Sequence, residues 1–264
     1  MAQYYDIAII GSGNVAWHLS QALENAGHNI HLVYDRKLKR AEALVAKLYN
    51  AEATDSLDFS SSRAAVFIVA IKDDAIREVA EKLELPNSES IVAHTSGSVP
   101  IEVLGYALRH YGSLYPLQSF IKSRQVDFKE IPIFIEASNT NTKHVLTRIA
   151  KSITKKVGYL NSNQRKALHV SGVFASNFVN HILTVAKQIT TKHKLDYHLL
   201  APLIVETVNK SLELGPENSQ TGPAARGDLE VLDAHLEFLK DDPALHDIYK
   251  SLSQHILDQA YYEK

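Results

Sequence analysis

The chain contains no cysteine, which excludes disulfide bonds, thiolate nucleophiles and cysteine-based metal sites. It has no excess of basic residues, because 28 Lys and Arg residues are balanced by 30 Asp and Glu residues. The formal net charge of -2 therefore argues against nucleic acid as a partner. The 13 histidines are scattered and show no metal-ligand spacing such as HExxH, so we expect no bound metal.

Long hydrophobic runs are also missing. The apolar run near the N-terminus ends at Gly11, which is far too short to cross a bilayer, and no basic segment or cleavage site accompanies it. Apolar residues make up 45% of the chain and charged residues 22%, as in an ordinary globular protein. We therefore expect a cytoplasmic protein without a membrane partner.

Two patterns divide the 264 residues into two predicted domains. In residues 1–160, short apolar runs alternate with helical patterns, which predicts a doubly wound parallel sheet of the Rossmann type. Residues 161–264 contain no convincing strand, so we expect an all-α domain there and a boundary near 158–162. The predicted long helices of this second domain cover 163–192, 196–214 and 228–262. The expected fold class is therefore α/β, with a Rossmann domain followed by a helical domain.

The segment GSGNVA follows a predicted strand and opens a predicted helix. Its first glycine permits a tight turn, its second lets the backbone approach a pyrophosphate, and Ala16 keeps the helix close to the sheet. The N–H groups at the start of the helix would then bind the phosphates of a dinucleotide. The alternative is a tight strand-to-helix turn without a ligand. The predicted phosphate-binding turn comprises Gly11, Ser12, Gly13, Asn14 and Val15.

The end of the second predicted strand bears on the choice between NAD and NADP. Asp35 stands where an acid accepts hydrogen bonds from the adenosine ribose, which favours NAD. The next residue, Arg36, could instead bind the 2′-phosphate of NADP. Both cofactors therefore stay open at this point.

Further loops are expected at the same edge of the sheet, because the carboxyl ends of parallel strands lie together. One follows the strand predicted at 64–71, and another is the HTSGS segment after the strand at 91–94. Local capping of the backbone is the alternative explanation for their small polar side chains. The candidates are Ala70, Ile71 and Thr95 for the cofactor and His94, Ser96 and Ser119 for the substrate.

A polar stripe marks the first helix of the predicted helical domain, in LHVSGVFASNFVNHI. His169, Gly172, Ser176 and Asn180 are spaced 3, 4 and 4 residues apart, which places them within about 80° on an α-helix. The opposite positions are apolar, so we expect a nearly buried helix whose polar side chains need partners. A ligand could supply those partners, and so could a neighbouring helix. His169, Ser176 and Asn180 are therefore candidate substrate-side residues.

These motifs together resemble the Rossmann-like proteins that carry the domain of unknown function 2520. The resemblance rests on GSGNVA, HTSGS, YPLQSF, LHVSGVFASNFVNH, PLIVETVNK and QTGPAARGD and covers essentially the whole chain. The chain is also similar, more distantly, to pyrroline-5-carboxylate reductase and to the 6-phosphogluconate and β-hydroxyacid dehydrogenases. The resemblance implies an N-terminal NAD(P)-binding domain and an all-α domain that often builds a dimer.

One departure from the dehydrogenase pattern affects the expected reaction. The β-hydroxyacid dehydrogenases carry a lysine within G-x-x-x-K-x-x-x-N. Gly172 and Asn180 match this pattern, but Ser176 occupies the lysine position. The departure argues against alcohol oxidation of the β-hydroxyacid type and fits better with reduction of an imine or carbonyl.

The leading hypothesis is an NAD(P)-dependent oxidoreductase that transfers a hydride between the cofactor and a small polar carbonyl, imine or hydroxy metabolite. His169 is the candidate general acid, because histidine is the side chain that titrates closest to neutral pH. A non-catalytic dinucleotide-binding sensor or assembly protein is the alternative, and a structural protein with an empty Rossmann turn is a third. A homodimer through the helical domain is expected in every case.

Overall fold

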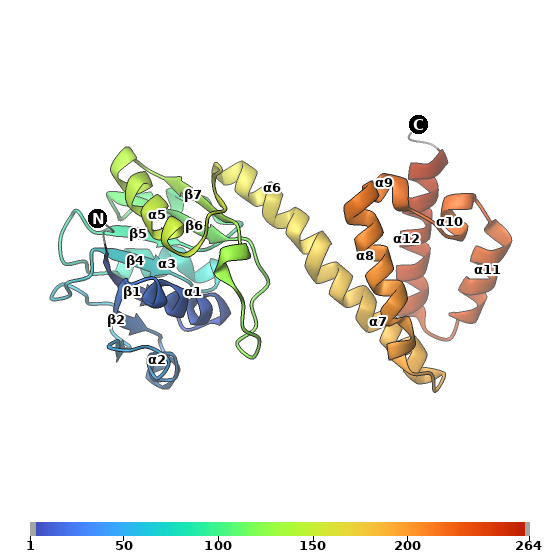
Figure 1. Ribbon diagram of the computed structural model, residues 1–264, viewed down its shortest axis with the longest axis horizontal. Helices are drawn as coiled ribbons and strands as arrows, with labels where there is room; N and C mark the ends of the chain where they lie inside the picture. The colour runs from blue at the N-terminus through green and yellow to red at the C-terminus, as the bar shows by residue number, and fades with distance from the viewer. Residues whose placement is uncertain (1–3, 262–264) are drawn as a thin grey trace. The chain divides into compact units, whose positions relative to one another are not determined.

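The computed structural model describes residues 4–261, in which the chain forms two compact units, the first ending at Asn177 and the second beginning at Phe178 (Figure 1). The boundary predicted near 158–162 coincides with the end of the last strand. The helix that follows this strand is nevertheless grouped with the first unit, because Arg165 and His169 bind to residues of the sheet.

The first unit contains an eight-stranded sheet, in the order β3-β2-β1-β4-β5-β6-β7-β8. Its strands are β1 (Asp6–Ile10), β2 (Asn29–Tyr34), β3 (Glu52–Thr54), β4 (Val66–Val69), β5 (Ile91–His94), β6 (His110–Pro116), β7 (Ile133–Ala137) and β8 (Val157–Tyr159). Its helices are α1 (Asn14–Asn25), α2 (Leu38–Val45), α3 (Ile76–Lys82), α4 (Glu102–Gly105), α5 (Thr140–Ile153) and α6 (Ser162–Gly172). The order of β1 to β6 is that of a doubly wound Rossmann sheet, so the predicted fold class is confirmed.

The prediction of an all-parallel sheet is wrong at its last two strands. β7 pairs with β6 in antiparallel orientation, and β8 runs parallel to β7. The reason is the connection between β6 and β7, which contains a short 3-10 helix, Phe128–Glu130, rather than a crossover helix. The short edge strand β3 was not predicted at all.

Two apolar clusters cover the two faces of the sheet. Alternate residues of the strands, such as Ile9 and Ala93, pack with α1, α2 and α5 on one face. The other residues, such as Ile10 and Val92, pack with α3 and α4 on the opposite face. Successive side chains of a strand point to opposite faces, so His94, which follows Ala93, belongs to the α3 and α4 face.

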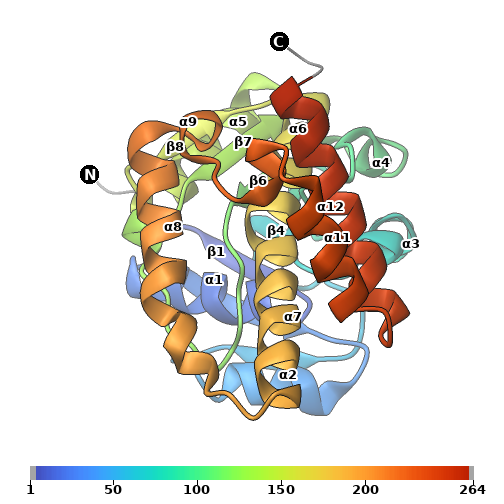
Figure 2. The ribbon, with the colours of Figure 1, turned by 90° about the vertical axis from the view of Figure 1, so that its right-hand side faces the viewer.

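In the described residues 178–261, the second unit consists of helices joined by short turns and contains no strand, as predicted. Its helices are α7 (Val179–Lys192), α8 (Ala201–Leu214), α9 (Pro216–Ser219), α10 (Pro223–Arg226), α11 (Leu229–Phe238) and α12 (Pro243–Tyr261). α11 packs beside α12 (Figure 2). Within residues 4–261, no helix is both long enough and apolar enough to cross a membrane.

A π-helical segment, Val173–Phe178, joins α6 to α7. Its winding differs from that of an α-helix, so the predicted stripe does not keep its α-helical spacing between Gly172 and Asn180. The expectation of a nearly buried helix is also wrong for this chain, because Phe174 is 64% exposed and Phe178 is 50% exposed.

Candidate functional site

The turn between β1 and α1 has a backbone that requires glycine at its first position. Gly11 has a φ of 112° and donates its N–H to the Tyr34 carbonyl at 2.7 Å. A Cβ at Gly11 would clash with the Ala70 carbonyl and lie 2.8 Å from Cγ2 of Ile71. The predicted turn residues of β1 and the predicted cofactor residues after β4 are therefore in direct contact.

The second glycine of the turn leaves open space beside the helix. A Cβ at Gly13 would meet only the Ala70 carbonyl, at 4.0 Å. Gly13 and Asn14 are exposed, and no side chain caps the N-terminus of α1. Ala16 is fully buried against the sheet, as the fingerprint requires. The uncapped N–H groups and the open space fit the pyrophosphate of a dinucleotide.

The acid at the end of β2 is held in place by two hydrogen bonds. Ser12 Oγ donates to Asp35 Oδ2 at 2.6 Å, and the Lys37 N–H donates to Asp35 Oδ1 at 3.0 Å. Arg36 is exposed beside it. The structure thus brings Ser12 and Asp35 together at the point where an adenosine ribose would bind.

The loop after β5 is tied to β4 and to its own strand. The Thr95 N–H donates to the Val69 carbonyl at 3.0 Å. Ser96 Oγ accepts hydrogen bonds from the N–H groups of Ser98 at 3.1 Å and Val99 at 3.0 Å. Ser96 therefore shapes this loop from within, as local capping would.

His94 lies beneath the same loop and is fully buried. Its Nδ1 accepts a hydrogen bond from the Ser96 N–H at 3.2 Å, which leaves the proton of the neutral ring on Nε2. Burial, together with the nearby Arg165 guanidinium, lowers the pKa of His94 from 6.5 to about 3. The side chain is therefore neutral at physiological pH and supports the loop.

Tyr115, at the end of β6, forms a pair with His169 of α6. The Tyr115 hydroxyl lies 3.1 Å from His169 Nδ1, and the two rings meet edge to face with centroids 6.0 Å apart. Burial raises the pKa of Tyr115, which keeps the phenol protonated at neutral pH. Sequence analysis singled out His169 but not Tyr115. The feature of the sequence that could have identified Tyr115 is its hydroxyl group, which stands at the carboxyl end of an otherwise apolar strand.

Gly97 of the HTSGS loop lies directly against His169. A Cβ at Gly97 would come within 2.5 Å of His169 Nδ1 and 2.6 Å of Cγ. Any larger residue at this position would therefore displace the imidazole. The loop after β5 and the helix after β8 are thus in close contact at the carboxyl edge of β5 and β6.

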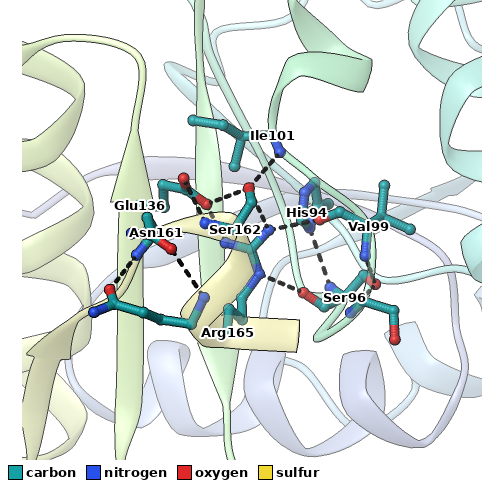
Figure 3. Close-up of polar contacts among 10 residues, drawn as sticks. His94, Ser96, Val99, Ile101, Glu136, Asn161, Ser162 and Arg165 are labelled. Atoms are coloured by element: carbon teal, nitrogen blue, oxygen red, sulfur yellow. Dashed lines mark hydrogen bonds and ion pairs between the residues drawn. The ribbon is translucent and has the colours of Figure 1, made fainter. Parts of the chain in front are cut away.

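A buried ion pair joins α6 to β7 (Figure 3). Arg165 of α6 is almost fully buried and binds the carboxylate of Glu136 in β7. Its Nε donates to the Ser96 carbonyl at 3.1 Å, and its Nη2 donates to the Val99 carbonyl at 2.6 Å. Neither Arg165 nor Glu136 was singled out from the sequence. A charged residue inside the apolar segment IPIFIEA was the available signal.

Three predicted substrate-side residues are not brought into this arrangement. Ser119 is exposed in the loop after β6, and Ser176 is exposed in the π-helical segment. Asn180 belongs to the second unit. The first unit therefore assembles His94, Ser96 and His169, with Tyr115, Glu136 and Arg165 added by the fold.

Two protein families match the chain. Residues 131–256 match the family described as "Domain of unknown function (DUF2520)", and residues 6–97 match "NADP oxidoreductase coenzyme F420-dependent". The first match confirms the resemblance inferred from the motifs. The second covers the glycine turn and the HTSG residues, which supports the expected NADP or NAD cofactor. A comparison with curated proteins finds no match.

Solved structures extend the similarity over the whole chain. A Bacteroides fragilis protein described as a "putative NADP oxidoreductase" is 39% identical, with 98% of this chain and 100% of that chain covered and a TM-score of 0.88. Protein TM1727 from Thermotoga maritima is 23% identical, with 96% and 99% covered and a TM-score of 0.76. Pyrroline carboxylate reductase from Plasmodium falciparum, with NADP bound, is 14% identical, with 97% and 98% covered and a TM-score of 0.59. The last two similarities concern the fold.

Proposed function

We propose that this chain, which belongs to the family of Rossmann-like proteins with the DUF2520 domain, is a reductase that transfers a hydride from NADPH to a small polar carbonyl or imine. The observation that carries the proposal is the contact between Tyr115 and His169 above Gly97. It lies at the carboxyl edge of the sheet that also carries the glycine turn, where Rossmann proteins bind their ligands.

The residues of the glycine turn would hold the cofactor. The N–H groups at the start of α1 would bind the pyrophosphate beside Gly13, and the adenosine ribose would lie near Asp35 and Arg36. The nicotinamide supplies the hydride. This leaves the protein to orient the substrate and to deliver one proton to its oxygen or nitrogen.

His169 is the proton donor in this proposal. The Tyr115 hydroxyl engages Nδ1 and fixes the plane of the ring, which leaves Nε2 to face the substrate. During reduction of the substrate, the His169 imidazolium would give its Nε2 proton to the substrate oxygen or nitrogen. The neutral ring that remains carries its proton on Nδ1 and donates it to the Tyr115 oxygen, which stabilises this tautomer.

The experiment is a screen of small carbonyls and imines with NADPH, followed by single-turnover kinetics of His169→Ala. Loss of a general acid lowers the hydride-transfer rate by about 10² to 10⁴ fold. NADPH affinity should stay unchanged, because His169 lies at the substrate side. His144→Ala, an exposed histidine on α5, is the matched control. A protein that binds NADPH but reduces no carbonyl or imine would contradict the reductase and favour a non-catalytic sensor.

Arg36 supports NADP over NAD within this proposal. Asp35 is already engaged by Ser12 and by the Lys37 N–H, whereas Arg36 is exposed beside it and carries the charge that a 2′-phosphate needs. Arg36→Ala should weaken binding of NADPH about tenfold or more and leave NADH binding nearly unchanged. Equal losses for both cofactors would contradict this assignment.

We also propose that the protein is a homodimer through its helical unit. On α8, Val205, Val208 and Leu212 form a stripe at i, i+3 and i+7, and their exposed fractions are 58%, 47% and 82%. A helical unit with so much apolar surface needs another surface to cover it. A second copy of the chain provides the same apolar stripe, which makes it the simplest self-complementary partner.

A further inference from the structure

A row of polar side chains crosses three strands on the α3 and α4 face of the sheet. His94 of β5 is in register with Ser113 of β6, and Ser113 is in register with Glu136 of β7. His94 and Ser113 are fully buried, and Glu136 is largely buried. Arg165 reaches this row from α6 and binds Glu136.

A contribution to the stability of the folded protein does not by itself explain this row of polar side chains. Among the described residues, Ser113 Oγ is buried without a hydrogen-bond partner. A buried ion pair contributes little stability over apolar side chains of the same size, because both charges lose their hydration. Such a costly arrangement points to a role in fixing the geometry of the residues around it.

The guanidinium of Arg165 holds both ends of one turn of the HTSGS loop. Its Nε binds the carbonyl of Ser96 and its Nη2 binds the carbonyl of Val99, while Nη1 binds Glu136. The planar guanidinium group has several N–H donors and can bind all three acceptors at once, whereas the ammonium group of a lysine cannot. The loop is therefore anchored from a strand two positions away in the sheet.

The same pair anchors the start of α6. Glu136 accepts hydrogen bonds from the N–H and from Oγ of Ser162, both at 2.8 Å. Ser162 Oγ in turn accepts from the Ile101 N–H at 3.2 Å. The loop and the first turn of the helix are thus joined through one carboxylate (Figure 3).

Helix α6 connects the Arg165–Glu136 pair to His169, the proposed proton donor. Arg165 and His169 are four residues apart on α6 and therefore lie on one face of the helix. Gly97, one residue after the anchored Ser96, packs against the His169 ring. A shift of the loop or a rotation of α6 would change the position of the imidazole.

We propose that the Arg165–Glu136 pair is a positioning latch that fixes the 96–101 loop against α6 and so places His169 over Gly97. Arg165 and Glu136 are positioning residues, since they act through the loop and the helix. The catalytic consequence rests on the proposed reductase function. Whether the pair fixes the 96–101 loop can be tested independently of the proposed reductase function.

The first test measures hydrogen exchange in the cofactor-free protein. The double variant Arg165→Met/Glu136→Leu removes both charges and keeps apolar bulk, and thermal denaturation checks that it is fully folded at the temperature of the exchange experiment. The amides of Ser98, Val99 and Ile101 should exchange about tenfold faster or more, the factor that corresponds to one weakened hydrogen bond. Unchanged exchange at these amides in the folded variant would overturn the latch.

Arg165→Lys tests whether a positive charge beside Glu136 is enough to fix the loop, or whether the guanidinium of arginine is required. This variant also replaces the double variant if the latter does not fold. Lysine keeps the positive charge beside Glu136 but cannot span both loop carbonyls. Faster exchange of the same amides is expected in this variant, and full rescue by lysine would overturn the proposal. Lys156→Met breaks the exposed ion pair with Glu130 and is the matched control.

The second test measures single-turnover hydride transfer from NADPH. Both latch variants should lose on the order of a hundredfold in rate, as expected for a donor displaced by about 1 Å, with NADPH affinity changed far less. A wild-type rate in a variant whose loop exchanges faster would overturn the positioning role. If the wild type binds no NADPH, the proposed function fails, whereas the exchange experiment still decides whether the loop is latched.

Discussion

The two units bury their apolar side chains to very different extents. In the sheet unit, the strands are covered on both faces by continuous apolar clusters. In the described residues 178–261, the buried side chains are Ser219, Ala224, Leu232 and Leu245. The sheet unit thus has a complete core of its own, whereas the helical unit leaves most of its large apolar side chains exposed.

Because of this difference, we expect the candidate site and the oligomeric state to depend on different units. The turn at Gly11, the loop after β5 and the pair of Tyr115 and His169 all lie within the sheet unit and are held by its own contacts. Oligomerisation is expected to depend on the helical unit. Variants in the sheet unit should therefore change stability or chemistry, and variants in the helical unit should change the oligomeric state.

The largest effect is expected from Gly11→Ala in the sheet unit. The positive φ and the clash with the Ala70 carbonyl should lower the free energy of unfolding by about 3 kcal/mol or more, measured by denaturant titration. Gly13→Ala is the matched control, because its Cβ finds open space. It should change stability by less than about 0.5 kcal/mol yet weaken NADPH binding about tenfold or more. Equal stability of the two variants would contradict this account of the turn.

The second effect concerns the helical unit. Val208→Glu/Leu212→Glu places two carboxylates on the exposed stripe of α8 and should weaken the dimer about a hundredfold or more, because each side chain contributes about 1.5–3 kcal/mol when buried. Sedimentation should show a dimer for the wild type and a monomer for the variant at micromolar concentration.

A charge change elsewhere on α8 provides the control for that variant. Glu206→Lys lies on another face of the helix and should remain dimeric. A monomeric wild type would contradict the proposed role of the helical unit, and so would loss of the dimer in both variants.

The smallest effect is a dependence of stability on pH that originates in the core of the sheet unit. His94 is held neutral, with a pKa lowered to about 3, whereas the unfolded chain takes up a proton below pH 6.5. Stability is therefore fully present above pH 6.5 and falls as the pH decreases towards 3. This group should contribute a loss of about 2 kcal/mol between pH 7 and pH 5.

His94→Gln tests that contribution, because glutamine keeps an acceptor for the Ser96 N–H but does not titrate. Denaturant titrations at the two pH values should show a smaller difference for this variant than for the wild type. An identical difference for both proteins would show that His94 is not the buried neutral histidine of the core.

Much of the fold follows from local patterns in the sequence. The glycine turn, the buried runs around Ile9 and Ile68 and the change to helices after residue 160 predict the Rossmann sheet and the helical half. The reversal at β7 was missed, because an apolar segment such as IPIFIEA does not reveal its direction. The π-helical segment was missed because its residues show the same apolar spacing as an α-helix.

The candidate site was predictable only in part, because its members meet across strands. GSGNVA and HTSGS identify their loops through small residues that a tight backbone requires. Tyr115, Glu136 and Arg165 are separated by 20 residues or more; the register of β6 and β7 brings Tyr115 and Glu136 to one face of the sheet, and Arg165 reaches that face from α6. A polar residue in an apolar strand was the signal for Tyr115 and Glu136, whereas Arg165 lies in a polar helical segment that carries no such signal.

The central claim is that the carboxyl edge of the sheet unit binds a nicotinamide dinucleotide, and an NADPH titration tests it most directly. Trp17, the only tryptophan of the chain, lies on α1 close to the glycine turn, so its fluorescence should report occupancy. The account predicts saturable binding below millimolar concentration, with tighter binding of NADPH than of NADH. Absence of binding by either cofactor at millimolar concentration would contradict it.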